Sequence, residues 1–148
     1  MPYLSQASKT RLETCHPDLR RWTERLILRF DFTVVCGHRN EVDQEEAFRN
    51  GKSKVHYPDS RHNYFLSLAE DLAPWDQHRG VIDWDHPQRF ILLAGMGLEL
   101  ALEMELPITW GGDWDCDTFM RDHDFKDYPH YQLPKDWDPT MSKVTATV

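Results

Sequence analysis

Residues 60–71 read SRHNYFLSLAED, and this stretch carries His62 and Asp71. A second short segment, Asp-Tyr-Pro-His at residues 127–130, lies much further along the chain and adds another imidazole and another carboxylate. Two imidazoles and one carboxylate leave the fourth position of a tetrahedral zinc ion open for water, whose pKa the ion lowers to about 7. The two segments together therefore predict a zinc hydrolase.

Other motifs flank these segments in a fixed order along nearly the whole chain. They are Cys15–Leu19 (CHPDL), Val35–Arg39 (VCGHR), Gln44, Gly51–Ser53 (GKS), Ser60–Asn63 (SRHN), Ala69–Pro74 (AEDLAP), Trp110–Trp114 (WGGDW) and Asp127–His130 (DYPH). This ordered set resembles the D-alanyl-D-alanine carboxypeptidase-like zinc peptidases. Within them it most resembles the phage L-alanyl-D-glutamate endopeptidase branch, the endolysins that cut the stem peptide of the bacterial cell wall.

The resemblance implies a role for each residue of the expected centre. His62, Asp71 and His130 would bind one zinc ion per chain, and Asp127 would act as the general base. Three features depart from the usual pattern of the family. The loop from His62 to Asp71 is two residues longer than in the most compact members, the glycine usual in that loop is absent, and the usual His-Phe-Glu is replaced by His130-Tyr131-Gln132. The side-chain support of the third ligand is therefore expected to differ from that in relatives.

The resemblance also implies a substrate cleft around the metal. Arg39 would be a catalytic residue that contacts the substrate or the oxyanion, and a structural ion pair with an acidic residue is the alternative. Ser60 and Gln44 would line the cleft and bind substrate. Most remaining histidines are expected on the surface, although His123 is close enough in the sequence to be a spare ligand.

The implied function is hydrolysis of the peptide stem of peptidoglycan, at the L-alanyl-D-glutamate bond, by an endolysin that acts in host lysis. Two alternatives stay open, namely a D-alanyl-D-alanine carboxypeptidase with the same zinc ligands and a non-catalytic zinc-binding module of the cell wall. The presence of Asp127 favours catalysis. The short chain favours a cleft that is open at both ends, as an endopeptidase requires.

Targeting signals bear on where such an enzyme would act. Residues 1–10 are polar and lack the apolar core of a secretion signal, and no apolar run approaches the roughly 18 residues of a membrane span. We therefore expect no signal peptide and no membrane insertion. The protein would stay in the host cytoplasm until lysis and then act in the periplasm and cell wall, after release by a holin-like membrane partner.

Length and composition limit the remaining choices. A chain of 148 residues predicts one domain, which we place at residues 1–134, followed by a C-terminal tail at residues 135–148. A net charge of −8 argues against nucleic-acid binding, and a monomer is expected. Three cysteines without a Cys-x-x-Cys spacing predict neither a disulfide framework nor a structural zinc site, and we expect them as buried thiols.

Local patterns predict an α+β fold in which a small antiparallel sheet packs with about three helices, as in the hedgehog and D-Ala-D-Ala-peptidase fold. Helices are expected at 17–30, 41–50 and 87–102, and strands at 32–36, 66–73, 108–110 and 130–133. Gly51 would cap the second helix, and Pro74 would end the strand that carries Asp71. Residues 52–63 are expected as a loop that delivers His62.

An acidic run at Asp113, Asp115 and Asp117 resembles the start of a calcium-binding loop, with Asp124 at its twelfth position. Thr118 occupies the position where such loops need glycine, so a solvated acidic loop is the alternative. Since this run leads towards the expected base, a bound calcium ion would influence the geometry of the active site.

Overall fold

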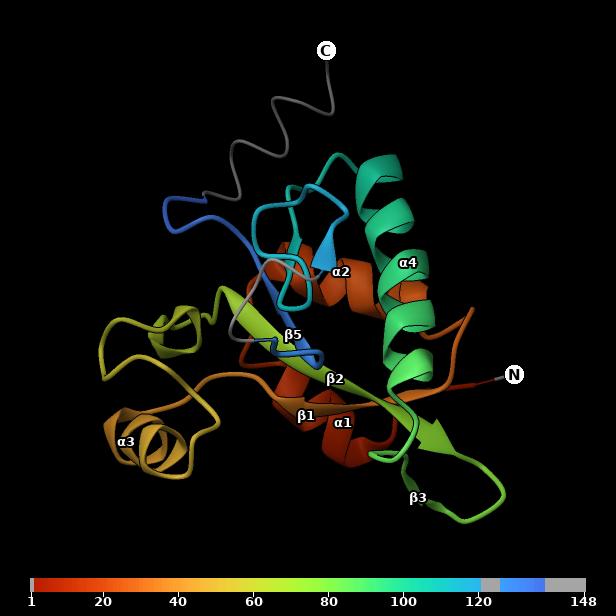
Figure 1. Ribbon diagram of the computed structural model, residues 1–148, viewed down its shortest axis with the longest axis horizontal. Coiled ribbons are helices and arrows are strands. Elements are labelled where there is room, and N and C mark those ends of the chain that lie inside the picture. The colour runs from red at the N-terminus through yellow and green to blue at the C-terminus, as the bar shows by residue number, and fades with distance from the viewer. Residues whose placement is uncertain (1, 121–125, 138–148) are drawn as a thin grey trace.

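The computed structural model describes residues 2–120 and 126–137 and shows the expected α+β fold (Figure 1). The helices are α1 (Gln6–Leu12), α2 (Pro17–Leu26), α3 (Glu41–Arg49) and α4 (Pro87–Glu103), with a short 3₁₀ turn, η1 (Arg61–Asn63). The strands are β1 (Phe32–Cys36), β2 (Ala69–Asp76), β3 (Val81–Ile82), β4 (Thr109–Trp110) and β5 (His130–Gln132). They form an antiparallel sheet in the order β1-β2-β5-β4, and β3 pairs with the end of β2.

Strand β2 lies in the middle of the sheet and carries the centre of the site. Its first six residues are all buried, and neighbouring strands pair with both of its edges. Asp71 is paired with Cys36 of β1 and with His130 of β5. Residues paired across antiparallel strands project from the same face of the sheet. The register therefore places the side chains of Asp71 and His130 next to each other.

Strand β2 continues past Pro74, so the prediction that this proline ends the strand is wrong. Proline has no N–H group, but its carbonyl accepts a hydrogen bond from the Asp83 N–H at 2.9 Å, and the next residue, Trp75, donates to the Asp31 carbonyl at 3.0 Å. The ladder is therefore maintained on both sides of the proline. The strand also begins at Ala69, three positions later than expected.

Helices α2 and α4 pack against each other beside the sheet (Figure 1). Their closest approach is at Gly97 of α4, where a Cβ atom would lie 2.8 Å from the Trp22 ring. The Trp22 indole N–H donates to the Gly97 carbonyl at 2.8 Å. Gly97 therefore allows the close contact with α2, which ends at Leu26 and not at residue 30.

Helix α1 is not predicted by the sequence patterns. The Ser5 hydroxyl accepts a hydrogen bond from the Ser8 N–H and caps its first turn. Only Ser8 and Leu12 of this helix are buried. The Ser8 hydroxyl in turn accepts a hydrogen bond from the Val34 N–H of β1 at 3.0 Å. Because the helix docks through a polar contact, hydrophobic periodicity does not reveal it.

Packing continues beyond residue 134, where the sequence places the start of a tail. Trp137 packs half-buried against the core, and its indole N–H donates to Asp18 of α2 at 2.8 Å. Residues 138–148 lie outside the described part of the chain. Within the described part, no helix has both the length and the apolar character that crossing a membrane requires.

Candidate metal centre and active site

Three side chains from three elements converge at one point. The His62 Nε2 atom lies 3.2 Å from Asp71 Oδ1 and 3.2 Å from His130 Nδ1, and these last two atoms lie 3.3 Å apart. All three residues are buried. Since η1, β2 and β5 supply one residue each, the cluster forms only when the connection before β2 folds onto the sheet.

The connection before β2 presents His62 through a local cap. The Ser60 hydroxyl accepts a hydrogen bond from the His62 N–H, and the Asn63 side-chain oxygen accepts one from the Ser60 N–H. This reciprocal arrangement fixes the start of the 3₁₀ turn. The Arg39 N–H donates to the His62 carbonyl at 2.8 Å and ties the turn to the end of β1. The Ser-x-His-Asn motif thus holds the backbone of His62 in place.

Hydrogen bonds on the outer side of both imidazoles direct their inner nitrogen atoms to the centre. The His62 Nδ1 atom lies 2.7 Å from the Gly37 carbonyl oxygen, and the His130 Nε2 atom lies 2.8 Å from Gln132 Oε1. Both oxygens only accept, so the outer nitrogens carry the protons and the inner nitrogens present lone pairs. This donor set, with fixed outer N–H groups, fits a metal ion.

The carboxylates around the centre have different electrostatic environments. Burial alone would raise the pKa of Asp71, but the charges and hydrogen bonds of His62 and His130 hold it well below its usual range. The Asp127 Oδ2 atom lies 4.0 Å from His130 Nδ1. Burial and the negative charge of Asp71 raise the pKa of Asp127 to about 6. Asp71 therefore has the ionised carboxylate that a metal ligand needs, and Asp127 has a pKa suited to proton transfer near neutral pH.

The Trp-Gly-Gly segment positions Asp127. The Gly111 carbonyl accepts a hydrogen bond from the Asp127 N–H at 2.8 Å. A Cβ atom at Gly111 would lie 2.2 Å from the Asp127 carbonyl oxygen, which real structures do not allow. Beside it, the Trp110 indole N–H donates to the Tyr128 carbonyl at 2.7 Å. Glycine is required at position 111 because the two backbones touch there.

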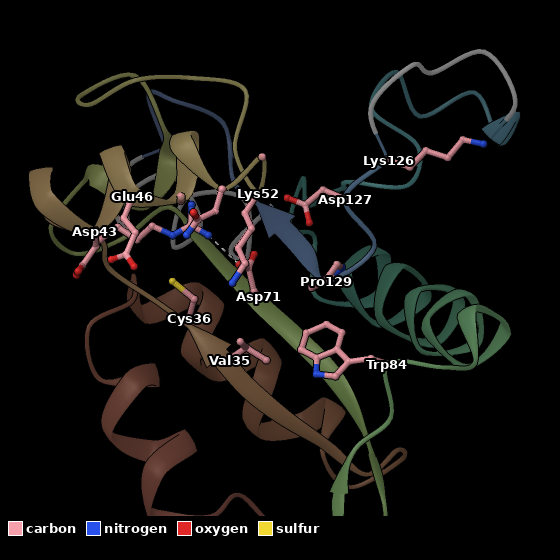
Figure 2. A pocket seen from close by; sticks show the side chains of 14 residues that line it. Val35, Cys36, Asp43, Glu46, Lys52, Asp71, Trp84, Lys126, Asp127 and Pro129 are labelled. Carbon is pink, nitrogen blue, oxygen red and sulfur yellow. Dashed lines mark hydrogen bonds and ion pairs between the residues drawn. The ribbon is translucent and has the colours of Figure 1, made fainter.

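Two hollows open from this centre, and both are lined by Arg39, Lys52 and Asp127. The larger one, of about 760 Å³, is lined by side chains from α3, β1 and β2 and from the connection that carries Trp84, as Figure 2 shows. The smaller one, of about 280 Å³, follows residues 52–62 and reaches both histidines. A bound chain can therefore extend from the centre in two directions.

Comparison with known proteins identifies the type of enzyme. The phage L-alanyl-D-glutamate peptidase family matches the chain over residues 2–133. The chain belongs to this family. Among solved structures it is similar to the L-Ala D-Glu endopeptidase ChiX of Serratia marcescens, with a TM-score of 0.68 and 28% identity over 90% of this chain and 91% of that one. A comparison with curated protein sequences gave no match. The expected fold and the assignment as a peptidase, a hydrolase, are thereby confirmed.

Arg39 of this peptidase forms an ion pair with the metal-ligand candidate Asp71. Its Nη2 atom donates to Asp71 Oδ2 at 3.1 Å, on the oxygen that does not face the histidines. The guanidinium therefore orients the carboxylate, which is the structural alternative considered from the sequence. It also lines both hollows, so contact with a bound substrate is compatible with this ion pair.

The two residues expected to line the cleft have different positions. Ser60 lines the smaller hollow. Gln44 is fully buried and is not among the described residues that line either hollow. Its amide nitrogen donates to the Ser53 hydroxyl and to the Val55 carbonyl, both at 2.9 Å. Gln44 therefore supports the wall of the smaller hollow from beneath.

Two further residues lie beside the centre: Cys36, to which sequence reasoning assigned no role, and Gln132, where it expected a change in the support of the third ligand. The Cys36 Sγ atom lies 3.9 Å from His62 Nδ1, and burial raises the pKa of its thiol to about 11, so it stays neutral. The Gln132 side-chain oxygen accepts a hydrogen bond from the outer N–H group of His130. The contact of Gln132 with His130 could have been predicted from the sequence, because residues two apart in a strand project from the same face of the sheet. Of the three cysteines only Cys15 is buried, and Cys116 is exposed, unlike the buried thiol expected.

The acidic residues singled out as a calcium site do lie together. Oxygen atoms of Asp113, Asp115 and Asp117 come within 4.8 Å of one another. Thr118 adopts a positive φ of 68°, at the position where calcium loops need glycine. The expected closing residue Asp124 and the spare ligand candidate His123 lie outside the described residues. Calcium binding therefore stays a prediction.

Proposed function

We propose that this peptidase uses one zinc ion, held by His62, Asp71 and His130, to hydrolyse the L-alanyl-D-glutamate bond in the stem peptide of peptidoglycan. The observation that carries this proposal is the convergence of three donor atoms within 3.2–3.3 Å of one another. Two imidazoles and one carboxylate are typical of catalytic zinc, which keeps one position open. The family and the bond named for the Serratia enzyme support the choice of substrate.

The proposed mechanism assigns one task to each residue. Bound zinc would supply Lewis acidity and make water a nucleophile near neutral pH. Asp127 removes the proton of the attacking water and returns it to the leaving amine. Its pKa of about 6 keeps it ionised at neutral pH. Arg39 holds the outer oxygen of Asp71, so that the inner oxygen stays directed at the centre.

Endopeptidase action is supported over terminal trimming by the shape of the cleft. A carboxypeptidase needs a cleft that is closed at one end, where it binds the terminal carboxylate of its substrate. Here two hollows meet at Arg39, Lys52 and Asp127, so chain on both sides of the cut bond can be accommodated. The alternative of a non-catalytic zinc-binding module is disfavoured because Asp127 is present with a pKa suited to proton transfer.

Digestion of purified peptidoglycan tests this proposal. We expect new amino termini on D-glutamate, identified by mass spectrometry, and no release of reducing sugar. Release of free D-alanine without new D-glutamate termini would show a carboxypeptidase, and reducing sugar would show a glycosidase. Muropeptides treated with metal-depleted protein are the control, and activity should return with added zinc.

We also propose that the enzyme serves as an endolysin, kept in the host cytoplasm until a holin-like partner opens the membrane to the periplasm and wall. Membership of a phage peptidase family supports this. Expression in a Gram-negative host should lyse the cells only when a membrane-permeabilising protein is co-expressed. Lysis by the peptidase alone would contradict the need for a partner.

A further inference from the structure

We infer the direction in which the substrate lies in the cleft: D-glutamate and the residues after it occupy the smaller hollow beside Arg61 and Lys54, and L-alanine with its muramyl sugar occupies the larger hollow beside Trp84. This inference rests on the proposed function, because it assumes cleavage between L-alanine and D-glutamate. It assigns substrate-binding roles to residues that the catalytic proposal does not use.

The first observation is a difference in charge between the two hollows. Apart from the residues that both hollows share, the smaller one is lined by the cations Lys54 and Arg61 and by one carboxylate, Asp59. The larger hollow is lined by the carboxylates Asp43, Glu46 and Asp71 and by one cation, Lys126. An anionic part of a ligand is therefore favoured in the smaller hollow and disfavoured in the larger one.

The second observation is that Arg61 has no anionic partner within residues 2–120 and 126–137. Its Nε–H group is buried and finds no hydrogen-bond acceptor among the described residues. No described residue forms an ion pair with its guanidinium, in contrast to Arg39, which binds Asp71. A half-buried guanidinium without a partner is unfavourable, since its desolvation is not compensated. A ligand carboxylate in the smaller hollow would provide that compensation.

The stem peptide carries its negative charge on one side of the cut bond only. D-Glutamate continues the stem through its side-chain carboxyl, so its α-carboxylate is free and lies next to the nitrogen atom of the scissile amide. L-Alanine is instead joined to the neutral lactyl ether of the muramyl sugar. Arg61 and the ligand candidate His62 both line the smaller hollow, so a cationic side chain lies on the side of the centre where we place the α-carboxylate. Charge complementarity therefore orients the peptide.

The larger hollow has the apolar surface that the sugar end requires. Trp84 is 55% exposed and lines this hollow with Val35 and Pro129 (Figure 2). One face of its indole stacks on Phe90, with ring centroids 5.8 Å apart and planes at 25°. This contact holds the ring in place and leaves its exposed surface available to the apolar face of a sugar.

The test measures binding and does not depend on turnover. Calorimetry with zinc-loaded Asp127→Asn protein would compare a stem tripeptide containing D-glutamate with the same peptide containing D-isoglutamine, whose α-carboxylate is amidated. We expect the acid to bind at least about tenfold more tightly, as a charge-assisted hydrogen bond provides. Arg61→Gln, and to a smaller extent Lys54→Gln, should abolish this preference in the same background.

Lys126→Gln is the matched control, because it removes the same charge from the other hollow and should keep the preference. Loss of the preference in Lys126→Gln but not in Arg61→Gln would indicate the opposite direction of the substrate and overturn the inference. Equal binding of both peptides to the unsubstituted Arg61 background would overturn it as well. For the sugar end, Trp84→Ala should weaken binding of the muramyl tripeptide and not of the free tripeptide. Failure of the wild type to cut the L-alanyl-D-glutamate bond would instead contradict the proposed function, which this comparison of affinities does not measure.

Discussion

Outer hydrogen bonds determine which nitrogen atom of His62 and of His130 faces the proposed metal site. For His62 the acceptor is the Gly37 backbone carbonyl, and for His130 it is the Gln132 side chain. A neutral amide accepts a hydrogen bond from the imidazole N–H but adds no negative charge near the centre. The centre is thus kept less negative than it would be with a carboxylate at this position.

The first prediction concerns Gln132. Gln132→Ala should weaken zinc affinity by about 10- to 100-fold, because the outer proton of His130 loses its acceptor and the ring loses its orientation. Gln132→Glu should retain the affinity. A chelator competition titration measures both, and Gln88→Ala, at an exposed position of α4, is the control. Unchanged affinity in Gln132→Ala would show that the ring is held by other contacts.

The second prediction separates ligand from base. His130→Ala should lose the bound zinc, because one of three donor atoms is removed. Asp127→Asn should keep the zinc and lose about 10²-fold or more of the activity, in the range of a general base. Metal analysis of the purified variants, combined with kcat measurements, checks both. If Asp127→Asn protein contains no zinc, Asp127 is itself a ligand and the roles of the two aspartates must be exchanged.

At the scale of elements, strands and loops position the catalytic groups through backbone contacts. The Gly111 backbone touches that of Asp127, and β5 follows directly after it. Strand β2 connects Asp71 near its start with Pro74, whose carbonyl accepts a hydrogen bond from the Asp83 N–H. The base therefore depends on a segment that has little regular structure of its own.

The third prediction tests the backbone contact at Gly111. Gly111→Ala should lower kcat/KM by about 10²-fold, because the new methyl group displaces the Asp127 backbone and misplaces the base. Gly95→Ala is the control, since a Cβ atom there meets nothing within 4 Å. In the middle of α4 this control should stabilise the protein by up to about 1 kcal/mol. Wild-type activity in Gly111→Ala would mean that the loop accommodates the methyl group.

The fourth prediction addresses the acidic loop that contains Asp113, Asp115 and Asp117. If calcium binds there, activity should rise with millimolar or lower Ca²⁺, and the Asp115→Asn/Asp117→Asn double variant should abolish the effect. Calorimetry on zinc-loaded protein measures the binding directly. No heat of Ca²⁺ binding in the wild type would leave the loop as a solvated acidic surface.

At the scale of the whole molecule, buried charge pairs link stability to pH. Asp83, which directly follows β3, is buried and accepts hydrogen bonds from His86 and Arg89. The hydrogen bond from His86 is the main cause that lowers the pKa of Asp83 to about 2. These contacts anchor the segment that carries Trp84, so the wall of the larger hollow depends on them.

The fifth prediction follows from that shift. The pKa of an unfolded aspartate is about 3.9, so the contribution of Asp83 to stability is complete above that pH and is lost as the pH falls towards 2. Asp83→Asn should therefore be less stable than the wild type at pH 6, and the difference should shrink between pH 4 and pH 2. Urea denaturation at each pH measures this. A difference that is constant with pH would assign the effect to packing.

The sequence by itself determined the assignment as a peptidase and most of the elements. The ligand and base residues lie in short motifs whose residue types restrict the chemistry, and these motifs carry the family resemblance. Strand β1 was expected at residues 32–36 and occurs there, because its β-branched run is bounded by polar residues. Gly51 follows α3 with a positive φ of 75°, as the expected cap requires.

Only the tertiary structure decided the remaining features, because each depends on a partner that is distant in the sequence. Helix α1 is held by a hydroxyl contact with β1, and β2 passes Pro74 because Asp83 and Asp31 complete its ladder. Burial of Gln44 and the pairing of Arg39 with Asp71 depend on how the 52–63 connection packs. The charge difference between the two hollows arises in the same way, since each wall combines side chains from separate elements and local patterns contain no information about such combinations.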